Sequence, residues 1–84
     1  MSVKKYTIYS TPTCHYCHLL KDWLSQNRIA FDNKDVATDI AARQEMVQKS
    51  QQLGVPVSVV QFADNTERVI VGFDQLQLSR LLGL

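Results

Sequence analysis

The sequence has few of the residues that stabilise disulfide-rich, membrane or nucleic-acid-binding proteins. Its 84 residues include only two cysteines, two prolines and three glycines, so a framework of several disulfides is excluded. No run approaches the ~20 consecutive apolar residues of a membrane-spanning helix. Nine basic and eight acidic residues leave a net charge of +1, which gives no charged surface for nucleic acid or an acidic membrane.

The apolar residues that are present fit one small folded domain. Hydrophobic residues make up 45% of the chain, which is ordinary for a globular protein and argues against disorder. A chain of this length has room for one core, so we expect a single domain over residues 1–84. The first residues lack the apolar run of a signal peptide, which predicts a cytoplasmic protein. No apolar stripe marks an interface, so we expect a monomer.

The two cysteines, Cys14 and Cys17, are separated only by His15 and Tyr16. A disulfide across so short a loop adds little stability, because its stabilising effect shrinks with loop length. In a reducing cytosol, a lone cysteine pair is more often catalytic or metal-binding than structural. A Cys-x-x-Cys between a strand pattern and a helix pattern is typical of a thiol pair that is made and broken in catalysis.

Strand and helix patterns alternate along the chain. Strands are expected at residues 6–9, 29–36, 57–62 and 68–71. One helix is expected after the cysteines, a second from an Asp39 cap through about Lys49, and a third after a box-like Asp74 and Gln77 start. The order βαβαββα predicts an α/β fold with a mixed four-stranded sheet covered by three helices. The apolar residues of the second helix are Ile40, Met46 and Val47, and the expected core residues of the other two are Trp23, Leu24, Leu78, Leu81 and Leu82.

Three separated motifs in this order resemble the glutaredoxin branch of the thioredoxin fold, over nearly the whole chain. Residues 9–17 are similar to the family's strand, loop and redox segment, residues 54–57 to its Thr-Val-Pro motif, and residues 71–74 to its Gly-Gly-x-Asp motif. The resemblance implies a thioredoxin-like fold and a thiol-disulfide oxidoreductase that reduces protein or glutathione mixed disulfides. It also implies a cis Val55-Pro56 bond against the cysteines, with the Val55 backbone open to pair with an extended substrate.

The resemblance further implies a groove for glutathione or another substrate. Gly72 is expected to permit a close backbone approach, and Asp74 to cap a helix whose N-terminus can receive a carboxylate. Phe73 either covers one side of the groove or completes the core, and Gln52 either reaches the groove or is an exposed polar residue. Tyr16 either packs beside the site or is a partly exposed spacer. The expected binding residues are Thr11, His15, Tyr16, Gln52, Val55, Pro56, Gly72, Phe73 and Asp74.

Several positions depart from the family's pattern. The usual proline between the cysteines is His15, and a frequent basic residue three before the first cysteine is Thr11. Gly54 replaces the threonine before Val-Pro, with Leu53 where an arginine is common, and Phe73 replaces the second glycine. Because the family uses the basic and glycine positions to hold glutathione, the electron donor stays open between glutathione, as a co-substrate, and thioredoxin reductase. The single glycine is closer to small glutaredoxin-like proteins recharged by thioredoxin reductase. No tightly bound cofactor is expected.

Reduction of a disulfide needs a thiolate, and an ordinary cysteine is mostly protonated at neutral pH. Cys14 is expected at the first turn of a helix, where free backbone N–H groups favour an anion. It would attack the substrate disulfide, and Cys17, buried and protonated one turn further on, would resolve the mixed disulfide. His15 either stabilises the thiolate, making the protein a stronger oxidant than a proline version, or is an exposed histidine with little effect.

The same segment allows other chemistries. Cys-x-x-Cys followed by His18 is formally the signature of c-type haem attachment, but attachment needs export and would consume both cysteines, so an exposed polar His18 is favoured. Zinc ligands usually come from separated chain segments. The candidate ligands here lie within five consecutive residues, Cys14, His15, Cys17 and His18, so no metal site is predicted. The alternative function is a non-enzymatic carrier of a metal or an iron–sulfur cluster, held by the same cysteines.

Overall fold

The predicted order of strands and helices is confirmed. The computed structural model describes residues 2–84. Its elements are β1 (Val3–Ser10), α1 (His15–Gln26), β2 (Asp32–Asp35), α2 (Ile40–Ser50), β3 (Val57–Phe62), β4 (Glu67–Val71) and α3 (Gln75–Leu82). The strand expected at 29–36 is shorter, because Ile29 and Phe31 pack against the core before pairing with β1 begins at Asp32. None of the helices within residues 2–84 is long and apolar enough to cross a membrane.

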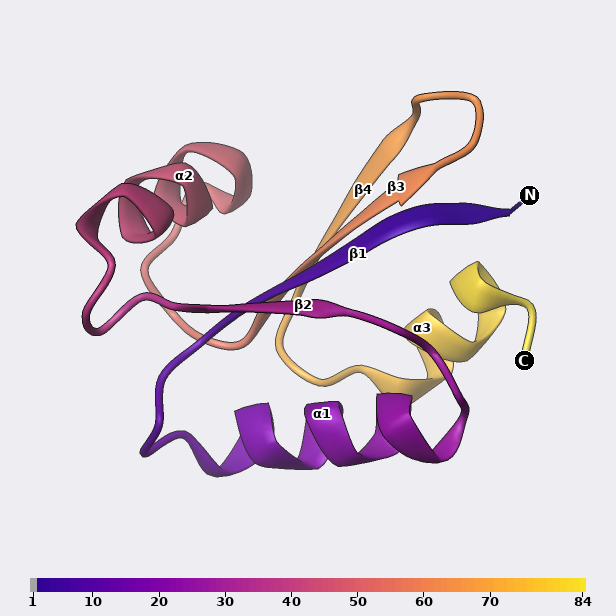
Figure 1. Ribbon diagram of the computed structural model, residues 1–84, viewed down its shortest axis with the longest axis horizontal. Helices are drawn as coiled ribbons and strands as arrows, with labels where there is room; N and C mark the ends of the chain where they lie inside the picture. The colour runs from indigo at the N-terminus through magenta and orange to yellow at the C-terminus, as the bar shows by residue number, and fades with distance from the viewer. Residues whose placement is uncertain (1) are drawn as a thin grey trace.

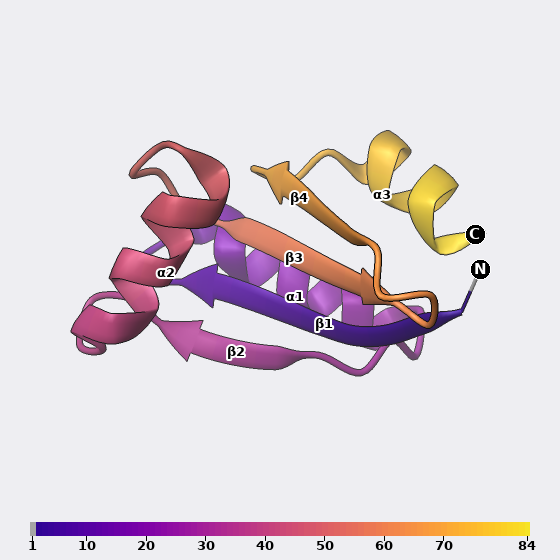
Figure 2. The ribbon, with the colours of Figure 1, turned by 90° about the horizontal axis from the view of Figure 1, so that it is seen from above.

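The four strands form one mixed sheet in the order β2-β1-β3-β4. β1 and β2 are parallel, whereas β3 is antiparallel to both β1 and β4. Helices α1 and α3 cover one face of this sheet, and α2 lies at the opposite face near one end (Figures 1 and 2). The arrangement is the predicted α/β sheet covered by three helices.

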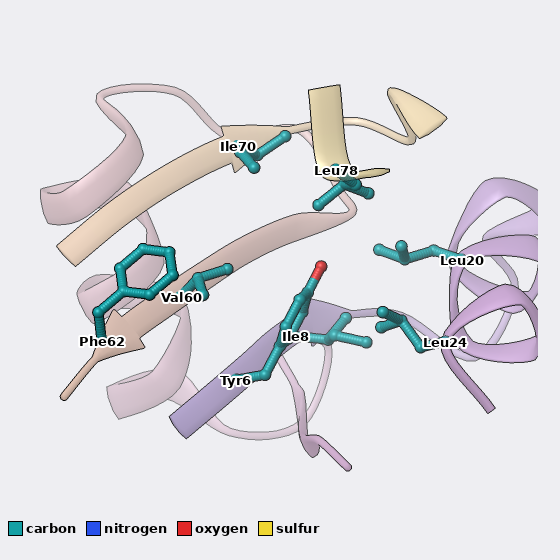
Figure 3. Packing of buried hydrophobic residues seen from close by; sticks show 8 residues of the cluster. All are labelled: Tyr6, Ile8, Leu20, Leu24, Val60, Phe62, Ile70 and Leu78. Atoms are coloured by element: carbon teal, nitrogen blue, oxygen red, sulfur yellow. The ribbon is translucent and has the colours of Figure 1, made fainter. Parts of the chain in front are cut away.

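Alternation along the strands divides the core into two clusters. Tyr6 and Ile8 of β1 face α1 and α3, whereas Tyr9 faces α2. Figure 3 shows side chains of the first cluster pointing toward one another, and they come from β1, β3, β4, α1 and α3. That cluster consists of Tyr6, Ile8, Leu20, Leu24, Val60, Phe62, Ile70 and Leu78.

Some residues expected to be apolar core lie at its edge or outside it. Trp23, Leu81 and Leu82 are half-buried and pack against the first cluster from its rim. Ile40 is 74% exposed, because it is the first residue of α2, while Met46 two turns later is buried. Helical spacing identifies the side that faces the sheet, but the ends of a helix extend beyond the sheet.

Each helix begins at a side chain that accepts a hydrogen bond from the N–H three residues later. Asp39 accepts from Ala42 at 3.0 Å, and Asp74 accepts from Gln77 at 3.1 Å, so both predicted caps are confirmed. These bonds satisfy N–H groups that have no partner within the helix. At the start of α1 the capping atom is instead the sulfur of Cys14.

A buried polar contact links β1 to β3 inside the first cluster. The Tyr6 hydroxyl donates to Ser58 Oγ at 2.8 Å, and both residues are buried. Burial raises the pKa of Tyr6 to about 12, and the Ser58 hydrogen bond partly offsets the rise. Since an unfolded tyrosine ionises near pH 10, this contribution to stability is present below about pH 10 and is lost as pH rises toward 12.

We expect Ser58→Ala to lower the free energy of unfolding by roughly 1–3 kcal/mol, because the buried Tyr6 hydroxyl loses its acceptor. Urea unfolding at pH 7 measures the loss. The double variant Tyr6→Phe/Ser58→Ala removes both polar groups and should recover most of it. An unfolding free energy of Ser58→Ala equal to that of the wild type would show that this hydrogen bond does not stabilise the core.

Candidate active site

Strand pairing brings the three motif segments to one end of the sheet. Tyr9 near the end of β1 pairs with Val57 at the start of β3, and Val57 pairs with Val71 at the end of β4. The segments that follow β1, precede β3 and follow β4 therefore meet at the same end of the sheet (Figure 2). These segments contain the cysteines, Val55-Pro56 and Gly72, so the fold brings together three motifs that are far apart in the sequence.

Cys14 is the N-cap of α1 and its sulfur is held by backbone groups. The Cys17 N–H donates to Cys14 Sγ at 3.1 Å, and the Cys14 thiol faces the Val55 carbonyl oxygen at 3.9 Å. The Cys14 N–H donates to the Thr11 carbonyl at 3.3 Å. The Cys14 side chain is half-exposed and both cysteines are free thiols. An N–H aimed at the sulfur at a helix N-terminus favours a negative charge there.

Cys17 has the opposite environment. It is completely buried, and this burial, reinforced by the hydrogen bond with Cys14, raises the pKa of its thiol to about 11. A backbone hydrogen bond from Thr11 and the charge of Lys21 lower that pKa by smaller amounts. At neutral pH Cys17 is therefore a protonated thiol, as the sequence predicts.

The Val55-Pro56 peptide bond is cis, as the family resemblance implies. Val55 is half-buried and Pro56 is buried. The Gly72 N–H donates to the Pro56 carbonyl at 2.8 Å, which joins the second motif to the third. Gly72 has φ +83°, and a Cβ built there meets no atom within 4 Å. The position favours glycine because of its φ angle, and the close backbone approach expected there for a bound substrate stays a prediction.

Phe73 and Asp74 have structural contacts on the far side of the site. Phe73 is half-buried, and its ring lies 5.9 Å from that of Trp23, centroid to centroid, so it completes the rim of the core. Asp74 is exposed and its carboxylate caps α3 through the Gln77 N–H. One N–H of the first turn of α3, that of Gln77, is thus paired with a carboxylate of the same chain.

Gln52 turns back on its own loop. The Gly54 N–H donates to Gln52 Oε1 at 2.6 Å, and Gln52 Nε2 donates to the Gly54 carbonyl at 2.9 Å. The sequence offers two alternatives for Gln52, a groove residue or a free polar one, and it misses this internal bridge. The signal is weak, because a glutamine two residues before a glycine has no characteristic pattern.

The remaining predicted residues lie around Cys14 on the surface. Tyr16 is 63% exposed, and its ring centroid is 5.9 Å from that of the exposed His15. His18 is exposed, but its Nε2 lies 2.8 Å from the Pro12 carbonyl oxygen, a contact that sequence reasoning missed. Helical side chains tilt toward the N-terminus, so a histidine one turn into α1 is placed to reach the preceding loop. Among residues 2–84, no three His, Cys, Asp or Glu side chains gather where they could hold a metal ion.

A family comparison identifies the relationship. The Glutaredoxin family model matches residues 6–61, which include both cysteines and the cis-proline. The chain belongs to the glutaredoxin family. It is 39% identical over 75 residues to an uncharacterized glutaredoxin-like 8.6 kDa protein in the rubredoxin operon of Clostridium pasteurianum, covering 89% of this chain and 93% of that protein. It is 32% identical over 75 residues to glutaredoxin-like protein NrdH of Lactococcus lactis, covering 89% and 96%.

Solved structures of this family and its fold agree with the architecture. The glutaredoxin from Methanosarcina mazei Go1 has a TM-score of 0.80 at 25% identity, covering 95% of this chain and 79% of that one. The thioredoxin-like protein BC3987 has a TM-score of 0.79 at 31% identity, covering 93% and 100%. The predicted fold class and glutaredoxin resemblance are both confirmed.

The two thiols of this glutaredoxin-family protein should differ in their reaction with iodoacetamide. At pH 8 we expect one carbamidomethyl group per reduced chain, on Cys14, because Cys17 is buried and its pKa is raised to about 11. Modification of Cys17 should appear only as pH rises toward 11, where its thiol ionises. Mass spectrometry of tryptic peptides locates the label, and denatured protein, in which both thiols react, is the control. Equal labelling of the two thiols in the native protein at pH 8 would contradict the assigned environments.

Proposed function

We propose that this protein is a monomeric dithiol oxidoreductase that reduces protein disulfides or glutathione mixed disulfides. The observation that carries the proposal is the asymmetry of the cysteine pair. Cys14 Sγ is half-exposed at the N-cap of α1 and accepts the Cys17 N–H at 3.1 Å. Cys17 is buried, which raises the pKa of its thiol to about 11. The exposed sulfur is suited to attack and the buried thiol to resolve.

The reaction proceeds in two exchanges that transfer two electrons from the protein to the substrate. The Cys14 thiolate attacks one sulfur of the substrate disulfide, and the other sulfur leaves as a thiolate. The Cys17 sulfur then attacks the Cys14 sulfur, and the Cys17 proton passes to the substrate sulfur that leaves Cys14. This step breaks the mixed disulfide, releases the second substrate thiol and leaves a Cys14–Cys17 disulfide.

The backbone of Val55 is the proposed docking position for the substrate backbone. Its carbonyl oxygen is 3.9 Å from Cys14 Sγ, so a strand that pairs with the Val55 backbone would have its disulfide beside the nucleophile. Extended peptides commonly bind by such strand addition, in which main-chain hydrogen bonds supply affinity. Disulfide-containing proteins with an extended segment beside the disulfide are therefore the proposed substrates.

The proposed reductant of the Cys14–Cys17 disulfide is thioredoxin reductase or glutathione, acting in the cytoplasm. The chemistry of the site favours thioredoxin reductase, because Thr11 and the exposed Leu53 supply no positive charge for the carboxylates of glutathione. Thr11 instead holds Cys14 through its backbone carbonyl. No tightly bound cofactor is part of the proposal.

The donor is tested with the oxidised protein and NADPH in two assays, one with thioredoxin reductase and one with glutathione and glutathione reductase. We expect rapid NADPH oxidation with thioredoxin reductase and slow oxidation with glutathione. The reverse order would assign glutathione as the co-substrate. If neither system reduces the protein and the reduced protein reacts with no disulfide, the proposed oxidoreductase activity is wrong.

A further inference from the structure

In the connection between α2 and β3, the Gln52 side chain forms hydrogen bonds with the backbone of Gly54. The Gln52 carboxamide uses both of its ends on Gly54: Oε1 accepts the Gly54 N–H at 2.6 Å and Nε2 donates to the Gly54 carbonyl at 2.9 Å. Gln52 Nε2 also lies 3.2 Å from Ser50 Oγ. A carboxamide has one acceptor and two donor hydrogens, so its hydrogen-bonding capacity is engaged within this loop.

Both ends of the same connection are anchored elsewhere in the fold. At one end Ser50 Oγ donates to the Met46 carbonyl at 2.6 Å, and the Gln51 N–H donates to the Val47 carbonyl at 2.8 Å. At the other end the Pro56 carbonyl accepts the Gly72 N–H at 2.8 Å. The Gln52 bridge therefore fixes the middle of a segment whose ends are already fixed.

The bridge acts on the peptide unit that leads into the site. The Gly54 carbonyl and the Val55 N–H belong to one planar peptide group, so a hydrogen bond that holds the carbonyl also sets the direction of the N–H. The carbonyl of Val55 itself faces Cys14 Sγ at 3.9 Å. Holding Gly54 in place thus orients the N–H of Val55, the residue whose carbonyl faces the nucleophile.

We propose that Gln52 is a positioning residue that orients the Val55 backbone for an extended disulfide substrate. The inference rests on the proposed function, because that function assigns strand pairing to Val55. Gln52 touches neither the substrate nor the reacting sulfurs and acts through Gly54. It is therefore expected to affect substrates that have a peptide backbone and to have no effect on those without one.

The same bridge explains the glycine that replaces the family's threonine before Val-Pro. A Cβ at Gly54 would lie 2.8 Å from Gln52 Oε1, which is too close for the carboxamide to keep its place. Gln52 and Gly54 therefore form one unit, and an alanine at position 54 should displace the Gln52 side chain. This predicts that the two positions are energetically coupled.

The test follows oxidation of the reduced protein by two disulfides. One is a peptide with an extended segment around its disulfide, and the other is bis(2-hydroxyethyl) disulfide, which has no backbone to pair. We expect Gln52→Ala to react about fivefold more slowly with the peptide, mainly because a higher peptide concentration is needed to reach half of the maximal rate. This is the size of effect that loss of hydrogen bonds of ordinary strength predicts. Its rate with the small disulfide and the alkylation of Cys14 should stay unchanged.

Matched variants make the test specific. Gln48→Ala removes a carboxamide from the exposed face of α2 and should match the wild type with both disulfides. Gln52→Glu keeps the Oε1 acceptor but places a carboxylate oxygen against the Gly54 carbonyl, so it should slow the peptide reaction at least as much as Gln52→Ala. Gly54→Ala should slow the peptide reaction, and adding it to Gln52→Ala should cause no further loss, because both changes break one bridge.

The outcomes separate this inference from the function on which it rests. If the wild type reacts with neither disulfide, the proposed function fails. If the wild type reacts and Gln52→Ala equals it with the peptide, slows equally with both disulfides, or combines multiplicatively with Gly54→Ala, the positioning role is wrong. Selective slowing with the peptide and no additivity support it.

Discussion

We expect Cys14→Ser to reduce disulfides at least about a thousandfold more slowly than the wild type, because a serine hydroxyl is not ionised at neutral pH and the attacking thiolate is lost. Cys17 cannot replace it, because it is completely buried and its pKa is raised to about 11. The coupled oxidation of NADPH, with a peptide disulfide and the reductase that serves the wild type, measures this loss.

The fold of Cys14→Ser should be intact. Serine is among the preferred N-cap residues, so its hydroxyl can accept the Cys17 N–H that now points at Cys14 Sγ. Unfolding in urea should therefore give a free energy close to that of the wild type. A folded Cys14→Ser protein that retains a tenth or more of the rate, roughly, would show that Cys14 is not the required nucleophile.

We expect Leu20→Ala to lower the free energy of unfolding by about 2–5 kcal/mol, the usual range for truncating a fully buried leucine. Leu20 has no exposed surface and packs in the cluster between α1, α3 and the sheet (Figure 3). Small domains have a total stability of only about 5–15 kcal/mol, so this change removes a large share of it. Urea unfolding followed by circular dichroism measures the difference.

Leu19 on the same helix provides the matched control for this prediction. It is 39% exposed, so Leu19→Ala removes fewer buried contacts and should cost less than about 1 kcal/mol. Both variants replace leucine with alanine on the same helix, so the change in helix propensity is the same. The burial of the leucine is therefore the difference between them. Equal losses at the two positions would contradict the assignment of Leu20 to the core.

Local sequence signals predicted much of the fold because their physical causes are local. Asp39 and Asp74 act as helix caps because a carboxylate needs only an N–H three residues later. The strand at 57–62 has the predicted bounds, since a run of β-branched residues is enclosed there by a proline and a turn. The strand expected from residue 29 was too long, because Ile29 and Phe31 are apolar for packing against the core and take no part in β2.

The candidate site was predicted only to the extent that motifs specify it. The family resemblance related Cys14, Val55 and Gly72, and the sheet pairings of Tyr9, Val57 and Val71 bring those segments together. The different burial of the two cysteines followed from helix position, because an N-cap is accessible and the next turn faces the core.

Contacts that depend on the path of a loop could not be predicted. The Gln52 bridge to Gly54 needs a particular loop conformation, which begins with Gln51 at φ +59°. The contact between His18 and the Pro12 carbonyl needs the loop before α1 to fold back over its first turn. Neither arrangement follows from residue type or spacing alone.

The most direct test of the central claim is to trap the mixed disulfide. Reduced Cys17→Ser protein is mixed with a peptide disulfide, quenched with acid and mapped by mass spectrometry. Because the resolving thiol is absent, we predict a stable adduct on Cys14 that carries half of the peptide disulfide. Failure of the folded Cys17→Ser protein to form an adduct on Cys14, or an adduct on Cys17 in Cys14→Ser, would contradict the assignment of Cys14 as attacker and Cys17 as resolver.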